Sequence, residues 1–517
     1  MSTTVEPPGT RAPRRAGSRE WVGLSVLTLA CLVYAMDLTV LHLAVPQISA
    51  QLQPTGQQLL WIIDVYGFMV AGLLITMGTL GDRIGRRRLL LIGAAAFGAV
   101  SVLAAFAPTA ETLILCRALL GIAGATVAPS TLSLIFNMFE DPRQRSLAVG
   151  TWVSAFSAGG IVGPMLGGLL LEHYWWGSVF LLAVPVMVLL LVLGPRVLPE
   201  FRDPEPGRLD PVSAALSVLT MIALVFAMKK FAQDGPGVLP LLALVIGLPA
   251  GALFVRRQLT RPDPMLDLRL FGTALFRTAL AINVIAIFVA FGYFLFVAQY
   301  FQLVLGLSPL HAGLAMAPSS VGFIIGSQAA PRLVRVVRPA YLIGGGMSLA
   351  ALGLALMTLL SVSGSPVPAV LAALLIALGL APVFGITTEL IVGSAPPEKA
   401  GAASGVSETG AELGGALGIS ILGSLSIAIY RGDLAQTLPP GVPDADLVRD
   451  TLGSAVGVAT TLPEPLGTAV LAAARDAFMD GVHLITGITA VLSLALAAMA
   501  LVRLRQVPAG ELSAAHD

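Results

Sequence analysis

Apolar runs of about twenty residues recur along almost the whole chain, separated by short polar breaks. A run of this length matches one helical crossing of a bilayer, because the hydrocarbon core is about 30 Å thick and a helix rises about 1.5 Å per residue. Backbone groups in lipid must bond within their own segment, so each run is expected to be helical. The runs predict fourteen spanning helices, at 21–43, 58–80, 89–107, 111–137, 146–170, 176–195, 211–228, 238–255, 275–301, 311–330, 340–361, 367–391, 402–429 and 481–502.

The composition agrees with an all-α integral membrane protein. Of the 517 residues, 56% are hydrophobic and only 11% are charged, whereas soluble domains carry roughly 25% charged residues. A water-soluble fold could not bury this much apolar surface. The net charge of +1 gives no reason to expect nucleic acid as a partner. The sequence has no P-loop and no cysteine–histidine cluster, so we expect no cofactor and no metal.

Arginine and lysine are distributed unevenly between the two sets of loops. With a cytoplasmic N-terminus, 24 of the 30 basic residues fall in cytoplasmic segments and five fall on the other side. Basic loop residues mark the cytoplasmic face. Because the number of crossings is even, both termini are expected in the cytoplasm. The apolar run from Trp21 is too long for a signal peptide and predicts the first spanning helix.

The chain also carries an internal repeat. Shifting 141–168 by 255 positions, without a gap, brings Gly159 onto Gly414 and Gly163 onto Gly418. Duplicated halves with a substrate site near the bilayer midplane are a transporter architecture. The expected organisation is a cytoplasmic tail (1–20), a six-helix bundle (21–195), two inserted helices with flanking loops (196–274), a second six-helix bundle (275–505) and a cytoplasmic tail (506–517).

One segment, 431–478, departs from the pattern of short loops. It is polar, lies on the extracytoplasmic side in the expected topology, and holds prolines around stretches that could form short amphipathic helices. We interpret it as an ordered extracytoplasmic hairpin, and a disordered loop is the alternative.

A charged loop over 81–88 joins the second and third expected helices. Glycine permits a tight turn, and an aspartate can pair with arginine or cap a helix. Such a clasp could form in one conformation and break in another; a plain positively charged loop is the alternative. The residues expected in this switch are Gly81, Asp82, Arg83, Gly85, Arg86 and Arg87.

Small residues recur at four-residue spacing in the fifth expected helix. Gly159, Gly163 and Gly167 fall on one face, Gly168 follows, and Pro164 bends the helix. Small residues let two helix backbones approach closely. Tight packing and a role in exchange are both compatible with this pattern. The thirteenth expected helix repeats the spacing.

Ionisable residues inside the spans are the leading site candidates, because charge is expensive in lipid. Asp37 in the first helix and Arg117 in the fourth lie at matching depths and could pair, either for proton coupling or as a static structural pair. Glu408 and Glu412 stand one turn apart on one face. Two such carboxylates resist joint ionisation, and a cationic substrate could displace the proton they hold. Glu408 could instead be hydrated and inert, so Glu412 is the one expected to face a cavity.

Asp64, near the outer end of the second helix, either serves coupling or lies at the membrane interface. Aromatic side chains on the spans could stack on an organic cation, although packing or an interfacial position is the alternative for each. The aromatic candidates are Tyr34, Trp61, Trp152, Phe156, Tyr293 and Tyr300.

These features together resemble the major facilitator superfamily, and within it the fourteen-helix drug:proton antiporters of the QacA, SmvA and LfrA group. The motifs that carry the resemblance are the 81–88 loop, the segments 36–46 and 61–67, the Arg117 helix and the glycines of the fifth helix. The resemblance covers about 20 to 505. It implies two pseudo-symmetric six-helix bundles plus two inserted helices, in a bacterial cytoplasmic membrane.

The resemblance further implies proton-driven efflux of hydrophobic cations such as quaternary ammonium compounds and dyes, by a monomer. Asp37, Asp64 and Glu408 fall at family positions tied to coupling or substrate charge. The sequence departs at His42, where many relatives have asparagine. It also lacks an extra acidic residue in 275–361, which favours monocations over dications.

Two other functions compete with this reading. An exporter of an endogenous metabolite or a self-made antibiotic could use the same fold and the same charges. A membrane-embedded enzyme or sensor is the second alternative, but the sequence lacks the common catalytic motifs and a soluble signalling domain. We therefore expect no enzymatic activity.

Overall fold

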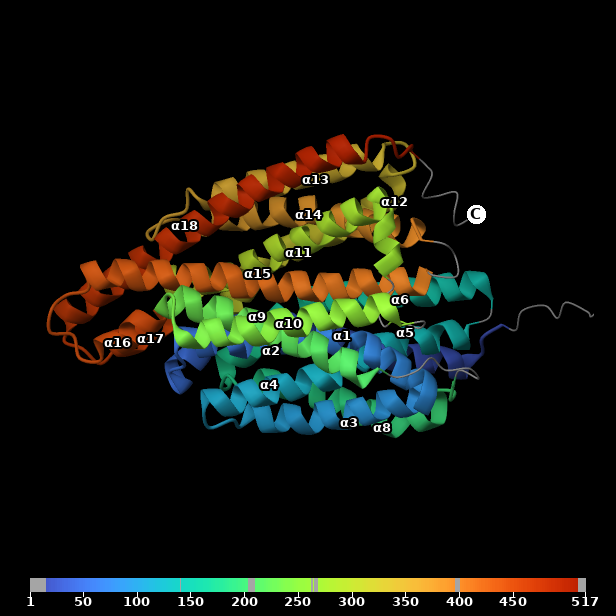
Figure 1. Cartoon of the computed structure of the whole chain (residues 1–517). Coiled ribbons are helices and arrows are strands. Elements are labelled where there is room, and N and C mark those ends of the chain that lie inside the picture. Colours follow the sequence, from blue (N-terminus) through green and yellow to red (C-terminus); the bar gives the residue numbers. More distant parts are fainter. Residues whose placement is uncertain are drawn as a thin grey trace, which may run out of the picture.

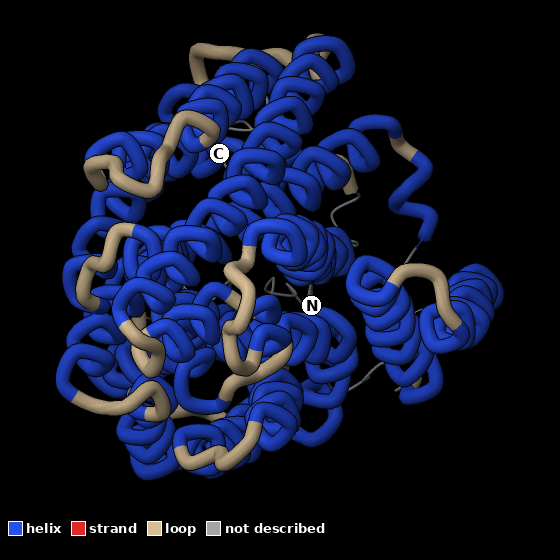
Figure 2. Tube along the Cα trace, turned by 90° about the vertical axis from the view of Figure 1, so that its left-hand side faces the viewer, coloured by secondary structure: helices blue, strands red, loops and turns tan. Residues whose placement is uncertain are grey.

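The computed structural model describes residues 15–139, 141–202, 210–261, 264, 268–395 and 400–509. These residues form a bundle of long, roughly parallel helices (Figure 1) and contain no strand (Figure 2). The start of α1 (Ser18–Leu52) and the end of α18 (Glu464–Arg503) both lie at the same end of the bundle, which we call the terminal end. The short helices α16 (Ala445–Asp450) and α17 (Leu452–Ala459) lie at the opposite end, the hairpin end.

The first six crossings contain eight helices, because two crossings are interrupted. The chain breaks its regular helix at Ala125 and Thr126, and again at Leu182. After α1 these helices are α2 (Gly56–Ile84), α3 (Arg86–Ala105), α4 (Ala110–Gly124), α5 (Val127–Met138), α6 (Pro142–His173), α7 (Ser178–Leu181) and α8 (Ala183–Val197).

The inserted pair and the second half follow. A π-helical turn extends α11, and a short 3-10 helix precedes it. The elements are α9 (Pro211–Asp234), α10 (Val238–Thr260), η1 (Leu268–Gly272), α11 (Ala274–Gln299), η2 (Tyr300–Val304), α12 (Pro309–Leu333), α13 (Pro339–Met357), α14 (Val367–Gly393) and α15 (Ala400–Thr437).

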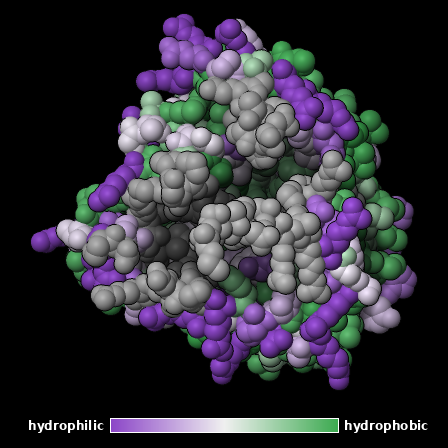
Figure 3. Space-filling view, turned by 90° about the vertical axis from the view of Figure 1, so that its right-hand side faces the viewer, coloured by the Kyte–Doolittle hydropathy of each residue, from purple (hydrophilic) through white to green (hydrophobic). Residues whose placement is uncertain are grey.

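Fourteen crossings account for the long helices of the described chain. Thirteen stretches are long and apolar enough to span a membrane, and α6, with 32 residues, packs along α1 as the remaining crossing. On α10, Leu241, Val245 and Leu248 are each more than half exposed. Such an apolar outer face suits contact with lipid. Hydrophilic side chains gather around the rim of the terminal end (Figure 3).

The segment 431–478 is mostly helical in the structure. α15 has 38 residues and α18 has 40, so both extend past the spans expected at 402–429 and 481–502. An ion pair between Arg431 and Asp450 joins α15 to α16, and the Tyr430 hydroxyl donates to the Val448 carbonyl at 3.0 Å. α17 packs against α1. The hairpin end is therefore covered by ordered helices.

Helix packing in the two halves follows the same pattern. A Cβ added to Gly159 on α6 would come within 2.7 Å of the Leu32 carbonyl oxygen on α1. A Cβ on Gly414 of α15 would come within 2.5 Å of the Val284 carbonyl oxygen on α11. Both helix pairs therefore need glycine for their close approach. The two glycines are the ones that the 255-residue shift superimposes.

The inserted helix α9 lies where the two halves meet. It packs on α2 from the first half and on α15 from the second. The Ser217 hydroxyl donates to the Gly72 carbonyl of α2 at 3.2 Å. Phe68 of α2, Val225 of α9 and Ala416 of α15 form a small apolar cluster separate from the main core. Helix α9 thus covers the seam between α2 and α15, and α10 packs on α9.

Candidate functional site

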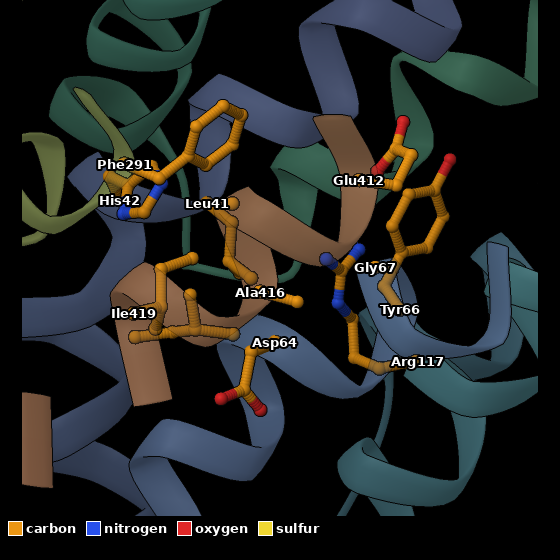
Figure 4. A pocket seen from close by; sticks show the side chains of 12 residues that line it. Leu41, His42, Asp64, Tyr66, Gly67, Arg117, Phe291, Glu412, Ala416 and Ile419 are labelled. Atoms are coloured by element: carbon orange, nitrogen blue, oxygen red, sulfur yellow. The ribbon is translucent and has the colours of Figure 1, made fainter. Parts of the chain in front are cut away.

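A cavity lies in the interior between helices of both halves (Figure 4). We call it the central cavity. Its walls come from α1, α2 and α4 on one side and from α11 and α15 on the other. The residues that line it are Leu41, His42, Ile63, Asp64, Tyr66, Gly67, Arg117, Phe291, Glu412, Gly415, Ala416 and Ile419.

A buried ion pair joins α1 to α4 beside this cavity. The Arg117 guanidinium lies 2.6 Å from the Asp37 carboxylate, and the two residues are 2% and 8% exposed. The Arg117 Nε also donates to the Ile62 carbonyl of α2 at 3.1 Å. Its guanidinium carbon lies 4.6 Å from the centre of the Tyr66 ring. The predicted pairing of Asp37 with Arg117 is confirmed, and this one arginine links three helices.

Asp64 is buried between the two halves. Its side chain is 1% exposed, and it accepts a hydrogen bond from the Ser420 hydroxyl of α15. Figure 4 shows Asp64 on the opposite side of Ala416 from Glu412. The bond to Ser420 therefore ties α2 to α15 at the level of the cavity.

Glu412 provides the second polar link between the halves. The hydroxyl of Tyr34 on α1 donates to a Glu412 carboxylate oxygen at 3.0 Å. Glu412 lines the central cavity, whereas Glu408, one turn nearer the terminal end, is not among the described lining residues. This placement agrees with the expectation that Glu412, of the two, faces a cavity.

Two polar atoms in the cavity wall have unused bonding capacity. The Tyr66 hydroxyl and the His42 Nδ1 are buried and have no hydrogen-bond partner among the described residues. Buried polar groups are normally paired. Both atoms therefore retain bonding capacity, but the Tyr66 hydroxyl lies against Gly124 of α4, which is outside the described lining of the cavity.

The other aromatic candidates whose side chains the structure describes are not among the lining residues of the central cavity. Trp61 packs with Phe68 in the cluster that α9 covers, and the Trp152 indole donates to the Thr131 hydroxyl at 3.1 Å. Tyr293 and Tyr300 line a separate small cavity. The side chain of Phe156 lies outside the described part of the structure.

Sequence reasoning missed two aromatic residues that do line the central cavity, Tyr66 and Phe291. Tyr66 lies two residues after Asp64, which is a weak signal, because an aromatic residue near a spanning charge is common. The position of Phe291 depends on how the two halves dock, and the sequence holds no sign of it.

The 81–88 loop packs against the chain that follows α8. Gly85 has a φ of +109°, which favours glycine. The Arg86 amide donates to the Phe201 carbonyl at 2.9 Å, and Arg87 pairs with Glu200 at 3.4 Å. Arg83 is exposed. The predicted clasp through Asp82 falls on a side chain outside the described residues; Glu200 is a partner that the sequence did not suggest.

The glycines of α6 are in close contact with two neighbouring helices, α1 and α12. A Cβ on Gly163 would come within 2.5 Å of the Thr39 hydroxyl oxygen of α1, and one on Gly167 would meet Val40. On α12, in the other half, the Pro309 carbonyl oxygen lies 2.7 Å from the position of a Gly168 Cβ. The glycine pattern therefore packs α6 both within its own half and across the seam.

Known proteins share this architecture and much of this sequence. Residues 27–419 match the family described as the Major Facilitator Superfamily. The chain is 45% identical to the multidrug efflux pump LfrA of Mycolicibacterium smegmatis over 98% of its own length and all of the relative. It is 36% identical to the methyl viologen resistance protein SmvA of Salmonella typhimurium, over 89% of its length and 93% of the relative.

Among solved structures, a bacterial homologue of the human lysosomal transporter Spinster, inward-facing and unoccupied, matches with a TM-score of 0.67. The match covers 95% of this chain and 98% of that one at 17% identity, so it shows the fold alone. The chain is thus a multi-pass membrane transporter. It belongs to the major facilitator superfamily, and the predicted all-α fold of that family is confirmed.

Proposed function

We propose that this protein is a proton-coupled antiporter that exports hydrophobic cations across the bacterial cytoplasmic membrane. The observation that carries the proposal is one buried cavity lined by two carboxylates, Asp64 and Glu412, and by Arg117, whose own charge is already balanced by Asp37. With all four ionised, the group would hold an excess of two negative charges. Uncompensated charge in a low-dielectric interior is costly, so protons or a cationic cargo must neutralise it.

Protons and cargo therefore compete for the same carboxylates. A carboxylate that has taken up a proton no longer attracts a cation, and a bound cation favours loss of the proton. This exclusion is what exchange of one for the other requires. The ring of Phe291 in the cavity wall suits an organic cation, whereas Arg117 already lies over the ring of Tyr66.

The same carboxylates also join the two halves. Tyr34 bonds Glu412 across the seam, and Ser420 bonds Asp64. Any movement of one half against the other must break or remake these bonds. A change in the charge of Glu412 or Asp64 therefore alters the contact between the halves, which couples occupancy of the site to conformation.

The relatives support the class of cargo and the direction of transport. LfrA is named as a multidrug efflux pump and SmvA as a methyl viologen resistance protein. The excess of basic residues in one set of loops supports an orientation with both termini in the cytoplasm. We expect a monomer to suffice, since the carboxylates and their partners all belong to one chain.

Proton release on cargo binding tests the proposal. Adding tetraphenylphosphonium to the purified protein in weakly buffered detergent should lower the pH, and Glu412→Gln should reduce the number of protons released per cation bound. Glu464 is an exposed carboxylate at the start of α18, so Glu464→Gln is the matched control and should leave the number of protons released per cation unchanged. Binding without proton release would contradict the proposal. Transport of neutral natural products in place of cations would favour export of an endogenous metabolite.

A further inference from the structure

A second cavity lies beneath the helices of the hairpin end, and we call it the hairpin cavity. Leu60 of α2, Leu295 of α11 and Gly423 of α15 all line it. Each of these residues is four positions from a residue that lines the central cavity. A four-residue step keeps the same helix face and moves about 6 Å along the axis. The hairpin cavity therefore continues the central cavity toward the hairpin end along the same three helix faces.

A pair of leucines divides the two cavities. A Cβ added to Gly423 would come within 2.5 Å of Leu60 Cδ2 and 3.0 Å of Leu295 Cδ2. Both leucines thus lie against α15 at the first turn beyond the central cavity. Leu60 belongs to the first half and Leu295 to the second. A movement of the halves that separates them would join the two cavities.

The hairpin cavity has a distinct chemistry. Asp450, Thr451 and Leu452, at the junction of α16 and α17, line it on the side of the hairpin end. Phe296 and Phe478 line its wall with ring centres 6.3 Å apart. Asp450 is the one carboxylate among the described lining residues, and it is paired with an arginine.

The two cavities differ in their charge balance. The central cavity is lined by two carboxylates, Asp64 and Glu412, and by Arg117, whose charge Asp37 balances from beside the cavity. In the hairpin cavity, the charge of Asp450 is balanced by Arg431. A hydrophobic cation would therefore be held more weakly in the hairpin cavity, through its aromatic walls and a shared carboxylate. Weak binding on the far side of a strong site is what release of a cargo requires.

We propose that the hairpin cavity is a release site for hydrophobic organic cations, with the rings of Phe296 and Phe478 as the surface that holds them and the charge-balanced Asp450–Arg431 pair keeping their binding weak. This inference rests on the proposed function, because it takes the cargo to be cationic. It assigns a binding role to residues of the hairpin segment that the central cavity does not use.

The proposal predicts effects of opposite sign for the two partners of one ion pair. Asp450→Asn removes one negative charge from the cavity wall while Arg431 keeps its positive charge, so a cation is repelled. Arg431→Gln leaves Asp450 uncompensated, so a cation is held. The double variant is neutral again and should behave like the unmodified protein. If the pair only fastened α16 to α15, all three variants would show the same defect.

Equilibrium binding and export can be measured on the same set of full-length variants. The unmodified protein should bind one tetraphenylphosphonium per chain, and Arg431→Gln should bind two. Asp450→Asn should bind one but export ethidium from cells about tenfold more slowly, and the double variant should recover export. The matched control is Asp446→Asn. Asp446 lies one turn away on α16 and pairs with Arg449 at the exposed surface. This variant should change neither quantity.

Equal loss of export in all three variants would overturn the release site, as would a single bound cation in Arg431→Gln. Should Arg431→Gln fail to fold, Phe296→Trp in a chain whose five native tryptophans are replaced by phenylalanine gives a second test. Its indole emission should be quenched by ethidium only above the concentration that saturates the central cavity, and an absence of quenching there would contradict the release site. If the unmodified protein binds no cation at all, the proposed function itself fails instead.

Discussion

Replacing Gly159 with alanine places a methyl group where α6 and α1 touch. The new Cβ would lie 2.7 Å from the Leu32 carbonyl oxygen and 2.6 Å from the Ala35 Cβ. Since one of these atoms belongs to the backbone, a side-chain rotation cannot relieve the contact. The two helices must move apart, and α1 carries both Asp37 and Tyr34 into the site.

The neighbouring residue provides the control. A Cβ on Gly160 would have no atom within 4 Å. Overpacking a close contact costs about 1–3 kcal/mol, whereas an unhindered glycine-to-alanine change within a helix gains about 0.5–1 kcal/mol. Gly159→Ala should therefore destabilise the protein, and Gly160→Ala should leave its stability unchanged or raise it.

Thermal unfolding of the two purified variants in the same detergent measures this difference. Gly159→Ala should melt at a lower temperature than the unmodified protein and should export ethidium from cells more slowly. Gly160→Ala should match or exceed the unmodified protein in both assays. Equal melting temperatures for the two variants would refute the close approach of α6 to α1.

Three further changes test other parts of the structure. Asp37→Asn leaves Arg117 buried without its partner, which costs about 3–5 kcal/mol, so folded yield and efflux should both fall; a yield equal to that of the unmodified protein would argue against a structural pair. Glu200→Gln removes an exposed partner of Arg87 and should cost under about 1 kcal/mol while slowing dye efflux; unchanged efflux would separate the loop from transport. Burial alone would raise the pKa of the Asp210 carboxyl, but hydrogen bonds from its surroundings lower it below the usual value. The contribution of Asp210 to stability is therefore present at neutral pH and lost as the pH falls below about 4. Asp210→Asn should accordingly weaken the fall of the melting temperature with pH across that range.

The sequence was sufficient for the features that depend on local properties of the chain. A spanning helix is a run of apolar residues, so its existence follows from composition and length alone. The pairing of Asp37 with Arg117 followed from counting residues along two helices. The glycines that pack α6 on α1 followed from spacing.

The features that the sequence did not specify depend on how distant segments dock. Tyr34 and Glu412 are 378 residues apart, and Asp64 and Ser420 are 356 apart. The sequence around Tyr34 does not indicate Glu412 as its partner, and the sequence around Asp64 does not indicate Ser420. From the sequence alone, Asp64 could therefore equally well be interfacial. The polar extensions of α15 and α18 have no apolar run to mark them, because their stability comes from packing against each other and against α16 and α17.

The central claim is that protons and cargo occupy the same carboxylates in turn. Ethidium accumulation in inside-out membrane vesicles, driven by an imposed pH gradient and voltage, tests it most directly. Accumulation should stop when ionophores collapse both gradients, and Glu412→Gln should fail to accumulate the dye even when both are present. Undiminished accumulation after the collapse would contradict proton exchange and would require another role for the buried carboxylates.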